Sequence, residues 1–253
     1  MSGPLPLSLC VITRDAAGEI ADCLASAAFA GEVIVVDSGS RDDTVEIARR
    51  CGARVIERDW PGYGAQKNFA VGEAAHDWVL CLDADERVTP EMAASIASAI
   101  VVPRAAACAF ARRNRFLGRW LEHGEGYPDW NVRLFDRRHA RWSDDPVHEH
   151  VIADGPVARM PGDLLHASAE SLDAYLAKQN RYTTLQAEAM HARGERAGPG
   201  RLVFAPIVRF VRFYVLKLGF LDGVPGLVHI AIGCQNSFLK YAKLRALQAG
   251  ESR

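Results

Sequence analysis

Three short apolar segments of the chain each run into a polar or acidic cluster. Each segment is rich in β-branched residues and is bounded by turn-forming residues, which is typical of strands buried in a sheet. If these strands run parallel, their carboxyl ends meet at one edge of the sheet, and ligands bind there. The sequence therefore predicts a ligand site lined by carboxylates. The clusters are Thr13-Arg14-Asp15, Asp37-Ser38-Gly39-Ser40 and Asp83-Ala84-Asp85-Glu86.

The third cluster has the chemistry of a divalent-metal site. Asp83 and Asp85 are alternate carboxylates at a strand end, and hard cations such as Mg²⁺ or Mn²⁺ bind through such oxygens. Holding the two acids this close, with Glu86 beside them, costs electrostatic free energy unless a cation is present. We therefore expect Asp83 and Asp85 to face a cleft with room for an ion. Arginines bound to both of them would argue against the metal site.

Several common nucleotide and acyl-transfer motifs are absent from the sequence. No Gly-x-Gly-x-x-Gly follows the first strand, no Gly-x-x-x-x-Gly-Lys-Ser/Thr occurs, and no Gly-x-Ser-x-Gly occurs. These absences disfavour a dinucleotide-dependent dehydrogenase, a P-loop enzyme and an α/β-hydrolase. A metal site without those loops favours a metal-bridged diphosphate as the leaving group.

The elements that would position these clusters alternate between strand and helix over the first hundred residues. This alternation predicts a parallel sheet with helices on both faces. The expected strands are Leu7–Thr13, Glu32–Asp37, Ala53–Glu57 and Trp78–Asp83, and the expected helices are Arg41–Cys51, capped by Ser40, and Pro90–Val101, capped by Thr89.

The remainder of the chain predicts a mixed sheet edge followed by helices. Arg133 alternates with apolar neighbours, which places it on the solvent-facing side of its strand. The predicted domains are 1–168, an α/β domain, and 169–253, a helical region. The expected strands are Ala107–Arg112, Asn131–Asp136 and His148–Ile152, and the expected helices are Ser171–Arg193, Arg201–Leu218 and Leu227–Leu247.

Composition and charge exclude some classes of protein. The 253 residues are 49% hydrophobic and 24% charged, as in an ordinary globular protein, and the net charge of −1 gives no support to nucleic-acid binding. The six cysteines lack metal-ligand spacing, and the N-terminal segment lacks the features of a signal peptide, so we expect a cytoplasmic protein.

Motifs along nearly the whole chain, about 5–247, resemble those of family 2 glycosyltransferases. These motifs include LSLCVITRD, EVIVVDSGSRDDT, WPGYGAQKNFAV, DWVLCLDADERVTPEM, DDPVHEHV, GDLLH and GFLDG. More narrowly, they resemble the β-glucosyltransferase-like members of lipopolysaccharide core biosynthesis. The resemblance implies a GT-A (Rossmann-like) α/β fold with a mixed sheet and a C-terminal helical extension. It also implies a nucleotide diphosphate sugar, most commonly a UDP-sugar, as donor.

The resemblance implies roles for matching positions. Asp37 would hold the base or ribose, Lys67 would lie near the diphosphate, and Asp83 would contact the ribose or the metal. Asp85 would coordinate Mg²⁺ or Mn²⁺. Thr13 and Asp15 lie at the nucleotide end of the site. Family members usually carry Lys-Asn-Glu-Glu where this chain has Arg14-Asp15-Ala16-Ala17. The missing glutamate leaves open which nucleotide base the donor carries.

The transfer chemistry needs a base as well as a metal. Departure of the nucleoside diphosphate builds negative charge, which a bound metal neutralises, and the acceptor hydroxyl must lose a proton to a carboxylate. A single displacement inverts the anomeric centre, as is expected of family 2. Glu149 is favoured as the base because related members carry a similar His-Glu after a strand, and His148 is a candidate metal ligand. The other candidate bases are Asp129, Asp144 and Asp145.

The C-terminal region has the composition of helices that lie on a membrane. Residues 201–253 carry eight basic and two acidic side chains, and 201–220 is mostly apolar with Arg209, Arg212 and Lys217 interspersed. We expect a protein peripheral to the inner membrane that acts on a lipid-linked saccharide. The alternative is that these helices pack on the core or form a dimer interface.

Two other functions are compatible with parts of the sequence. A sugar nucleotidyltransferase uses a similar sheet, but it would need a signature rich in glycine and in lysine or arginine after the first strand, which Thr13–Gly18 does not provide. A non-catalytic, membrane-associated nucleotide-binding protein would fit the altered 14–17 segment but not the retained Asp83 and Asp85.

Overall fold

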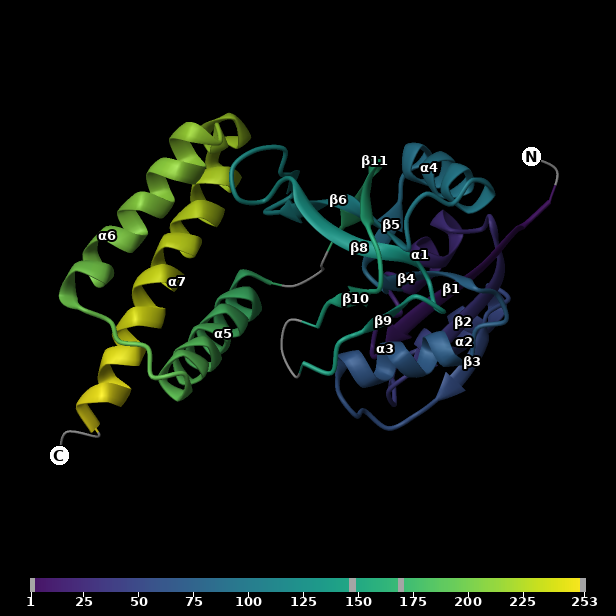
Figure 1. Ribbon diagram of the computed structural model, residues 1–253, viewed down its shortest axis with the longest axis horizontal. Coiled ribbons are helices and arrows are strands. Elements are labelled where there is room, and N and C mark those ends of the chain that lie inside the picture. The colour runs from purple at the N-terminus through teal and green to yellow at the C-terminus, as the bar shows by residue number, and fades with distance from the viewer. Residues whose placement is uncertain (1–2, 146–148, 168–170, 251–253) are drawn as a thin grey trace. The chain divides into compact units, whose positions relative to one another are not determined.

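The computed structural model describes residues 3–145, 149–167 and 171–250, which form two compact units (Figure 1). The sheet unit comprises Met1–Arg112 and Asp129–Ala167, and the helical unit comprises Arg113–Pro128 and Ser168–Arg253. The helical unit thus includes 113–128, which the sequence analysis assigned to the first domain.

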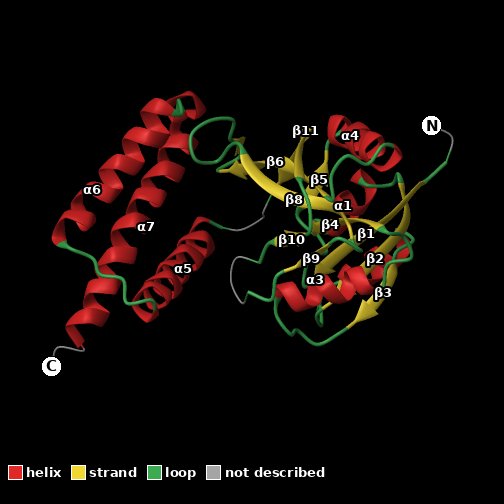
Figure 2. Ribbon diagram, viewed as in Figure 1, coloured by secondary structure: helices red, strands yellow, loops and turns green. Residues whose placement is uncertain are grey.

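A mixed sheet forms the first unit (Figure 2). Its strand order is β3-β2-β1-β4-β8-β6-β11-β5, in which β1 to β4 run parallel and β8, β6, β11 and β5 add the antiparallel part. Strands β9 and β10 form a separate two-stranded antiparallel sheet. The strands are β1 Leu5–Thr13, β2 Ala30–Asp37, β3 Arg54–Glu57, β4 Trp78–Asp83, β5 Glu86–Val88, β6 Ala107–Phe116, β7 Arg119–Trp120, β8 Asp129–Asp136, β9 Ala140–Trp142, β10 Val151–Ala153 and β11 Val157–His166.

Helices cover both faces of this sheet because its buried strands are apolar on both sides. Leu9 and Val11 of β1 pack in one core cluster with α1 and α4, whereas Cys10 and Ile12 pack in a second cluster with α3. Successive side chains of a strand point to opposite faces, so one strand serves both clusters. The helices are α1 Ile20–Ser26, α2 Thr44–Arg50, α3 Tyr63–Gly72 and α4 Pro90–Val101.

The predicted α/β architecture is confirmed, with differences at particular positions. Thr89 caps α4 as predicted, accepting a hydrogen bond from the backbone N–H of Met92. Ser40 does not cap α2: the residue before that helix is Asp43, and the Ser40 hydroxyl instead binds Asp37. The prediction for Arg133 was also wrong, since its side chain is buried at 6% exposure against acidic partners. Helices α1 and α3 and strands β5, β7, β9 and β11 had not been predicted.

Long helices make up most of the second unit. α5 spans Leu172–Ala192, capped by Ser171, and α6 spans Pro199–Phe210 and continues into a π-helical turn, η1, at Val211–Leu216. A short 3₁₀ turn, η2 at Gly219–Asp222, leads into α7, Gly223–Gly250, and both α5 and α6 pack along α7. The expected helices are therefore present, the last of them beginning earlier than predicted.

The length and the hydropathy of a helix together decide whether it could cross a bilayer. Within the described residues, no single helix is long and apolar enough for a span; Pro199–Leu216 and Gly219–Gly250 meet the criterion only as a pair, bent by 75°.

Candidate active site

The strand register brings the three predicted clusters together at one edge of the sheet. Thr13 at the end of β1 pairs with Asp37 at the end of β2, and Ile12 pairs with Asp83 at the end of β4. The carboxyl ends of three parallel strands therefore meet, which is where α/β sheets bind ligands.

Asp83 lies between two cationic side chains. Its Oδ1 atom is 3.0 Å from Lys67 Nζ, and its Oδ2 atom accepts a hydrogen bond of 3.0 Å from Arg133 Nη2. These cations outweigh the effect of burial and hold the pKa of Asp83 well below its ordinary value, so the carboxylate is ionised. Because cations engage both of its oxygens, this geometry does not support Asp83 as a ligand of a further cation.

Arg133, which binds Asp83, also forms a buried ion pair with Glu86. Glu86 is fully buried and accepts hydrogen bonds from Arg133 at Nε, 2.8 Å, and at Nη2, 2.7 Å. Arg112 binds Asp129 Oδ2 through Nε and Nη2, at 3.0 and 2.8 Å, and its Nη1 is 3.7 Å from Glu86. Asp129 is therefore held by Arg112 at the margin of the charged network.

Lys67 joins Asp83 to Glu149. Its ammonium group, contributed by α3 and only 5% exposed, donates a hydrogen bond of 2.9 Å to Glu149 Oε1 and lies 4.4 Å from the centroid of the Trp142 ring. Burial alone would lower the pKa of Lys67, but the carboxylates of Asp83 and Glu149 outweigh it and raise the pKa. The lysine thus stays charged, and its ammonium group lies between the carboxylates of Glu149 and Asp83.

Asp85 has a different environment from Asp83. Its Oδ2 atom is 3.1 Å from His166 Nε2, and both side chains are partly exposed, at 29% and 24%. The pairing with His166 lowers the pKa of Asp85 in spite of burial. The antiparallel pairing of β11 with β5 brings His166 next to Asp85, because His166 lies directly opposite Glu86. Carboxylate and imidazole are both ligands of Mn²⁺.

The loops that follow β1 and β2 are held in place by hydrogen bonds. Asp37 is 1% exposed and accepts hydrogen bonds from the backbone N–H groups of Gly39 and Ser40. Asp15, with a positive φ of 49°, accepts a bond from the backbone of Arg41, which ties the first loop to the second. Within the described residues, the buried Thr13 Oγ1 atom has no hydrogen-bond partner. Such an atom is costly unless a ligand or water binds it.

The remaining candidate residues lie away from the network or outside the description. Asp144 is 78% exposed beside Arg141, and Asp145 is paired with His150 at 3.4 Å. His148 lies outside the described residues. Of the candidate bases, Glu149 is thus the one bound to a side chain that also binds Asp83.

Sequence reasoning missed three parts of the site. Glu86 was noted only as a neighbouring charge, Arg133 was placed on the wrong side of its strand, and His166 was not considered, although it ends the GDLLH segment. An arginine alternating with apolar residues in a strand beside an acidic cluster is the signal that could have suggested a buried pair.

Arg133→Met should destabilise the sheet unit strongly. The change leaves Glu86 buried without its partner, which costs about 3–5 kcal/mol in comparable buried pairs, and urea unfolding measures the loss. Arg49→Met, which breaks an exposed pair with Glu57, is the control with a much smaller effect. Adding Glu86→Leu to Arg133→Met should restore part of the stability; a double variant less stable than the single one would contradict the buried-pair account.

The arrangement of the sheet unit is that of the GT-A class of glycosyltransferase folds. S. aureus TarS 1–349 in complex with UDP-GlcNAc is similar over 97% of this chain and 92% of that chain, with a TM-score of 0.50 and 14% sequence identity, which supports the fold alone.

The chain belongs to glycosyltransferase family 2, since the model described as Glycosyl transferase family 2 matches residues 8–152. The lipopolysaccharide core biosynthesis glycosyltransferase LpsC of Rhizobium meliloti is 29% identical over 98% of this chain and 95% of its own length. An uncharacterized glycosyltransferase of Rickettsia typhi is 30% identical over 95% of this chain and 87% of its own length.

Proposed function

We propose that this glycosyltransferase moves a hexose from a nucleotide diphosphate sugar, most simply a UDP-sugar, to the saccharide of a bacterial envelope glycolipid. Transfer depends on a divalent metal and inverts the anomeric centre. The observation that carries the proposal is the placement of Lys67 between Asp83 and Glu149 at the ligand-binding edge of the sheet. One cation there links a residue of the donor side with a carboxylate suited to deprotonate the acceptor.

The donor is bound by residues at the ends of β1, β2 and β4. Thr13, with its unpaired buried hydroxyl, and the loops carrying Asp15 and Asp37 accommodate the nucleoside. Asp83, held ionised, and the charged Lys67 lie where the ribose and diphosphate meet the sheet. TarS was crystallised with UDP-GlcNAc, which makes a UDP-sugar the first donor to test.

A divalent ion fits Asp85 and His166 better than it fits Asp83. The pair combines an oxygen and a nitrogen ligand that are both partly exposed and contact each other, whereas both oxygens of Asp83 are engaged by the cations Lys67 and Arg133. Among the described residues no three His, Cys, Asp or Glu side chains gather to hold an ion, so the substrate's phosphate oxygens and water would complete its coordination. When bound, such an ion neutralises the charge on the departing diphosphate.

Glu149 acts as the general base that takes the proton of the acceptor hydroxyl. Lys67 fixes its Oε1 atom, leaving Oε2 to approach the acceptor. Attack from the side opposite the leaving group gives a single displacement, and therefore inversion. Asp129 stands as the alternative base, although Arg112 already holds it.

The acceptor assignment comes from the relatives. LpsC is named as a lipopolysaccharide core enzyme, and the match spans nearly both chains. By analogy, this protein would act on a lipid-linked core saccharide at the cytoplasmic surface of the inner membrane.

Binding of nucleoside diphosphate should raise the melting temperature only when divalent metal is present. UDP with Mn²⁺ is the probe, and thermal unfolding is the measurement; at a hundredfold excess over Kd, the gain is about 2.7 kcal/mol. UDP in EDTA and Mn²⁺ without UDP are the controls. An equal rise in EDTA would contradict the bridging ion, and no rise with any nucleoside diphosphate would contradict the donor class.

A further inference from the structure

The helical unit exposes an unusually apolar surface. Phe204, Ile207 and Val208 of α6 are 64%, 53% and 62% exposed, and Leu216 and Val224 near the bend are 73% and 70% exposed. Not one residue of α6 is buried. Contiguous apolar surface of this kind marks a site of interaction with a protein or a membrane. We name these five residues and Val211 the apolar face.

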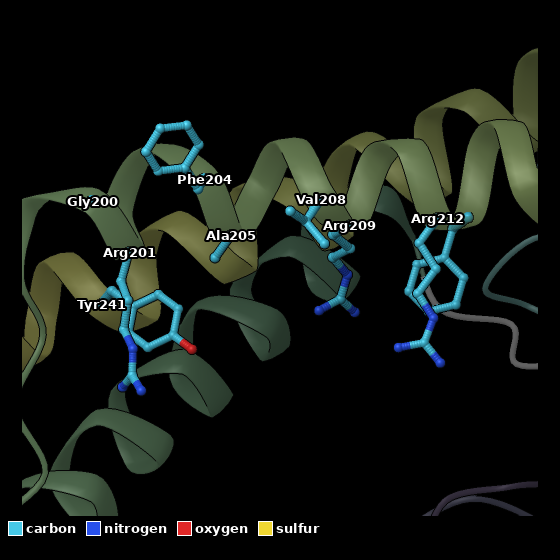
Figure 3. A pocket seen from close by; sticks show the side chains of 9 residues that line it. Gly200, Arg201, Phe204, Ala205, Val208, Arg209, Arg212 and Tyr241 are labelled. Carbon is cyan, nitrogen blue, oxygen red and sulfur yellow. The ribbon is translucent and has the colours of Figure 1, made fainter.

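Three residues of the apolar face share one side of α6, and two arginines lie on a neighbouring side. At 100° per residue, Phe204, Ile207 and Val211 fall within one third of the helix circumference. Arg201 and Arg212 fall together outside that arc, and Figure 3 shows them pointing the same way while Phe204 points in another direction. The helix is therefore amphipathic on its exposed side.

The arginines line a groove of about 560 Å³ together with Phe204 and Val208 of the apolar face. Arg209 is engaged by Glu125 and by Ser237 of α7. Arg201 and Arg212 lie against the rings of Tyr241 and Phe213, and among the described residues neither is paired with a carboxylate. Two guanidinium groups are thus available for external anions.

The charge of the surrounding sequence favours an anionic partner. Residues 199–250 contain seven basic side chains and one acidic side chain, Asp222. Asp222 is 1% exposed and accepts hydrogen bonds from the backbone N–H groups of Glu122 and His123. Exposed carboxylates, which anionic lipid would repel, are therefore absent from the described part of these helices.

We propose that α6 and η1 dock the protein on the anionic leaflet of a membrane. The helix lies in the plane of the interface: the apolar face enters the acyl boundary, and Arg201, Arg212 and Lys217 bind lipid phosphates. Adjacent apolar and cationic sides are the pattern of interfacial helices, and each arginine near an anionic surface adds about fivefold to binding. This inference extends the proposed function by specifying how the enzyme reaches a lipid-linked acceptor, and it rests on that acceptor class.

Vesicle flotation of the full chain tests the docking. Wild-type protein should float with vesicles of phosphatidylethanolamine and phosphatidylglycerol, and much less with phosphatidylcholine alone. Phe204→Ser combined with Leu216→Ser should reduce the bound fraction on anionic vesicles by about tenfold or more. Arg201→Gln combined with Arg212→Gln should reduce it by about twentyfold and flatten its salt dependence.

Val101→Ser is the matched control for the apolar variants. Val101 is 72% exposed on α4, almost the same as Leu216, but belongs to the sheet unit. It should float like wild type, and circular dichroism should show all variants folded.

Three outcomes would overturn the proposal: folded wild type that does not float, variants of the apolar face that float like Val101→Ser, or a dimer in sedimentation that Phe204→Ser and Leu216→Ser dissociate. The last would assign the face to a second copy. Hydrolysis of the nucleotide sugar is measured in parallel. Lost flotation with retained hydrolysis rejects the docking alone, whereas lost hydrolysis with retained flotation rejects the catalytic proposal alone.

Discussion

Glu149→Gln should lower kcat by about 10²–10⁴-fold, the usual contribution of a general base, with little change in donor affinity. Glutamine keeps the size of the side chain and can still accept the hydrogen bond from Lys67, so the site should stay assembled. What is lost is the capacity to take the acceptor proton. Steady-state kinetics with the natural or a synthetic acceptor measures kcat, and titration of nucleoside diphosphate measures donor binding.

Matched amide substitutions distinguish Glu149 from its competitors. Asp144→Asn, at a position that is 78% exposed, should leave kcat unchanged. Asp129→Asn should have a smaller effect than Glu149→Gln because Arg112 holds Asp129 at the margin of the charged network, whereas Glu149 shares Lys67 with Asp83. If Asp129→Asn loses turnover while Glu149→Gln keeps it, the base is Asp129.

Asp85→Asn should reduce metal-dependent turnover by about 10³-fold, equivalent to several kcal/mol of lost charge stabilisation. Asparagine retains the shape of the side chain but is a weaker ligand for a hard cation. The thermal stabilisation by UDP with Mn²⁺ should disappear together with activity, which separates loss of metal binding from loss of chemistry. His166→Asn should weaken the same response to a smaller degree.

The control for Asp85→Asn is another acidic residue outside the site. Asp22, whose side chain is 71% exposed beside Arg87, can be changed to asparagine without touching the network. Near-normal Mn²⁺ dependence in Asp85→Asn, with wild-type behaviour in Asp22→Asn, would remove Asp85 from the metal site and with it the proposed position of the ion.

Asp83 and Asp85 have different environments because different side chains contact them. They are two residues apart, yet Asp83 contacts Lys67 and Arg133 whereas Asp85 contacts His166. Two adjacent carboxylates repel each other, and here side chains from other elements relieve this repulsion. Asp83 can therefore remain ionised without a bound ion, and we assign the proposed metal to Asp85.

Local sequence patterns were sufficient for the parallel strands and for the edge where the site lies. Apolar β-branched runs ending in Thr13, Asp37 and Asp83 predicted three parallel strands, and the observed register brings those three residues together. The reason is physical: strand propensity and the turn signals that end a strand are properties of a few consecutive residues. The Thr89 cap of α4 was predictable on the same grounds.

Tertiary pairing alone decided which charges meet. Arg133 alternates with Val132 and Leu134. This pattern separates the two sides of a strand but does not tell which side is exposed to solvent. The antiparallel position of β8 beside β4 places Arg133 over Asp83 and Glu86, and the pairing of β11 with β5 brings His166 to Asp85 across some eighty residues of chain. Ion pairs buried in a sheet depend on these long-range contacts, and a local pattern can suggest a buried charge but does not identify its partner.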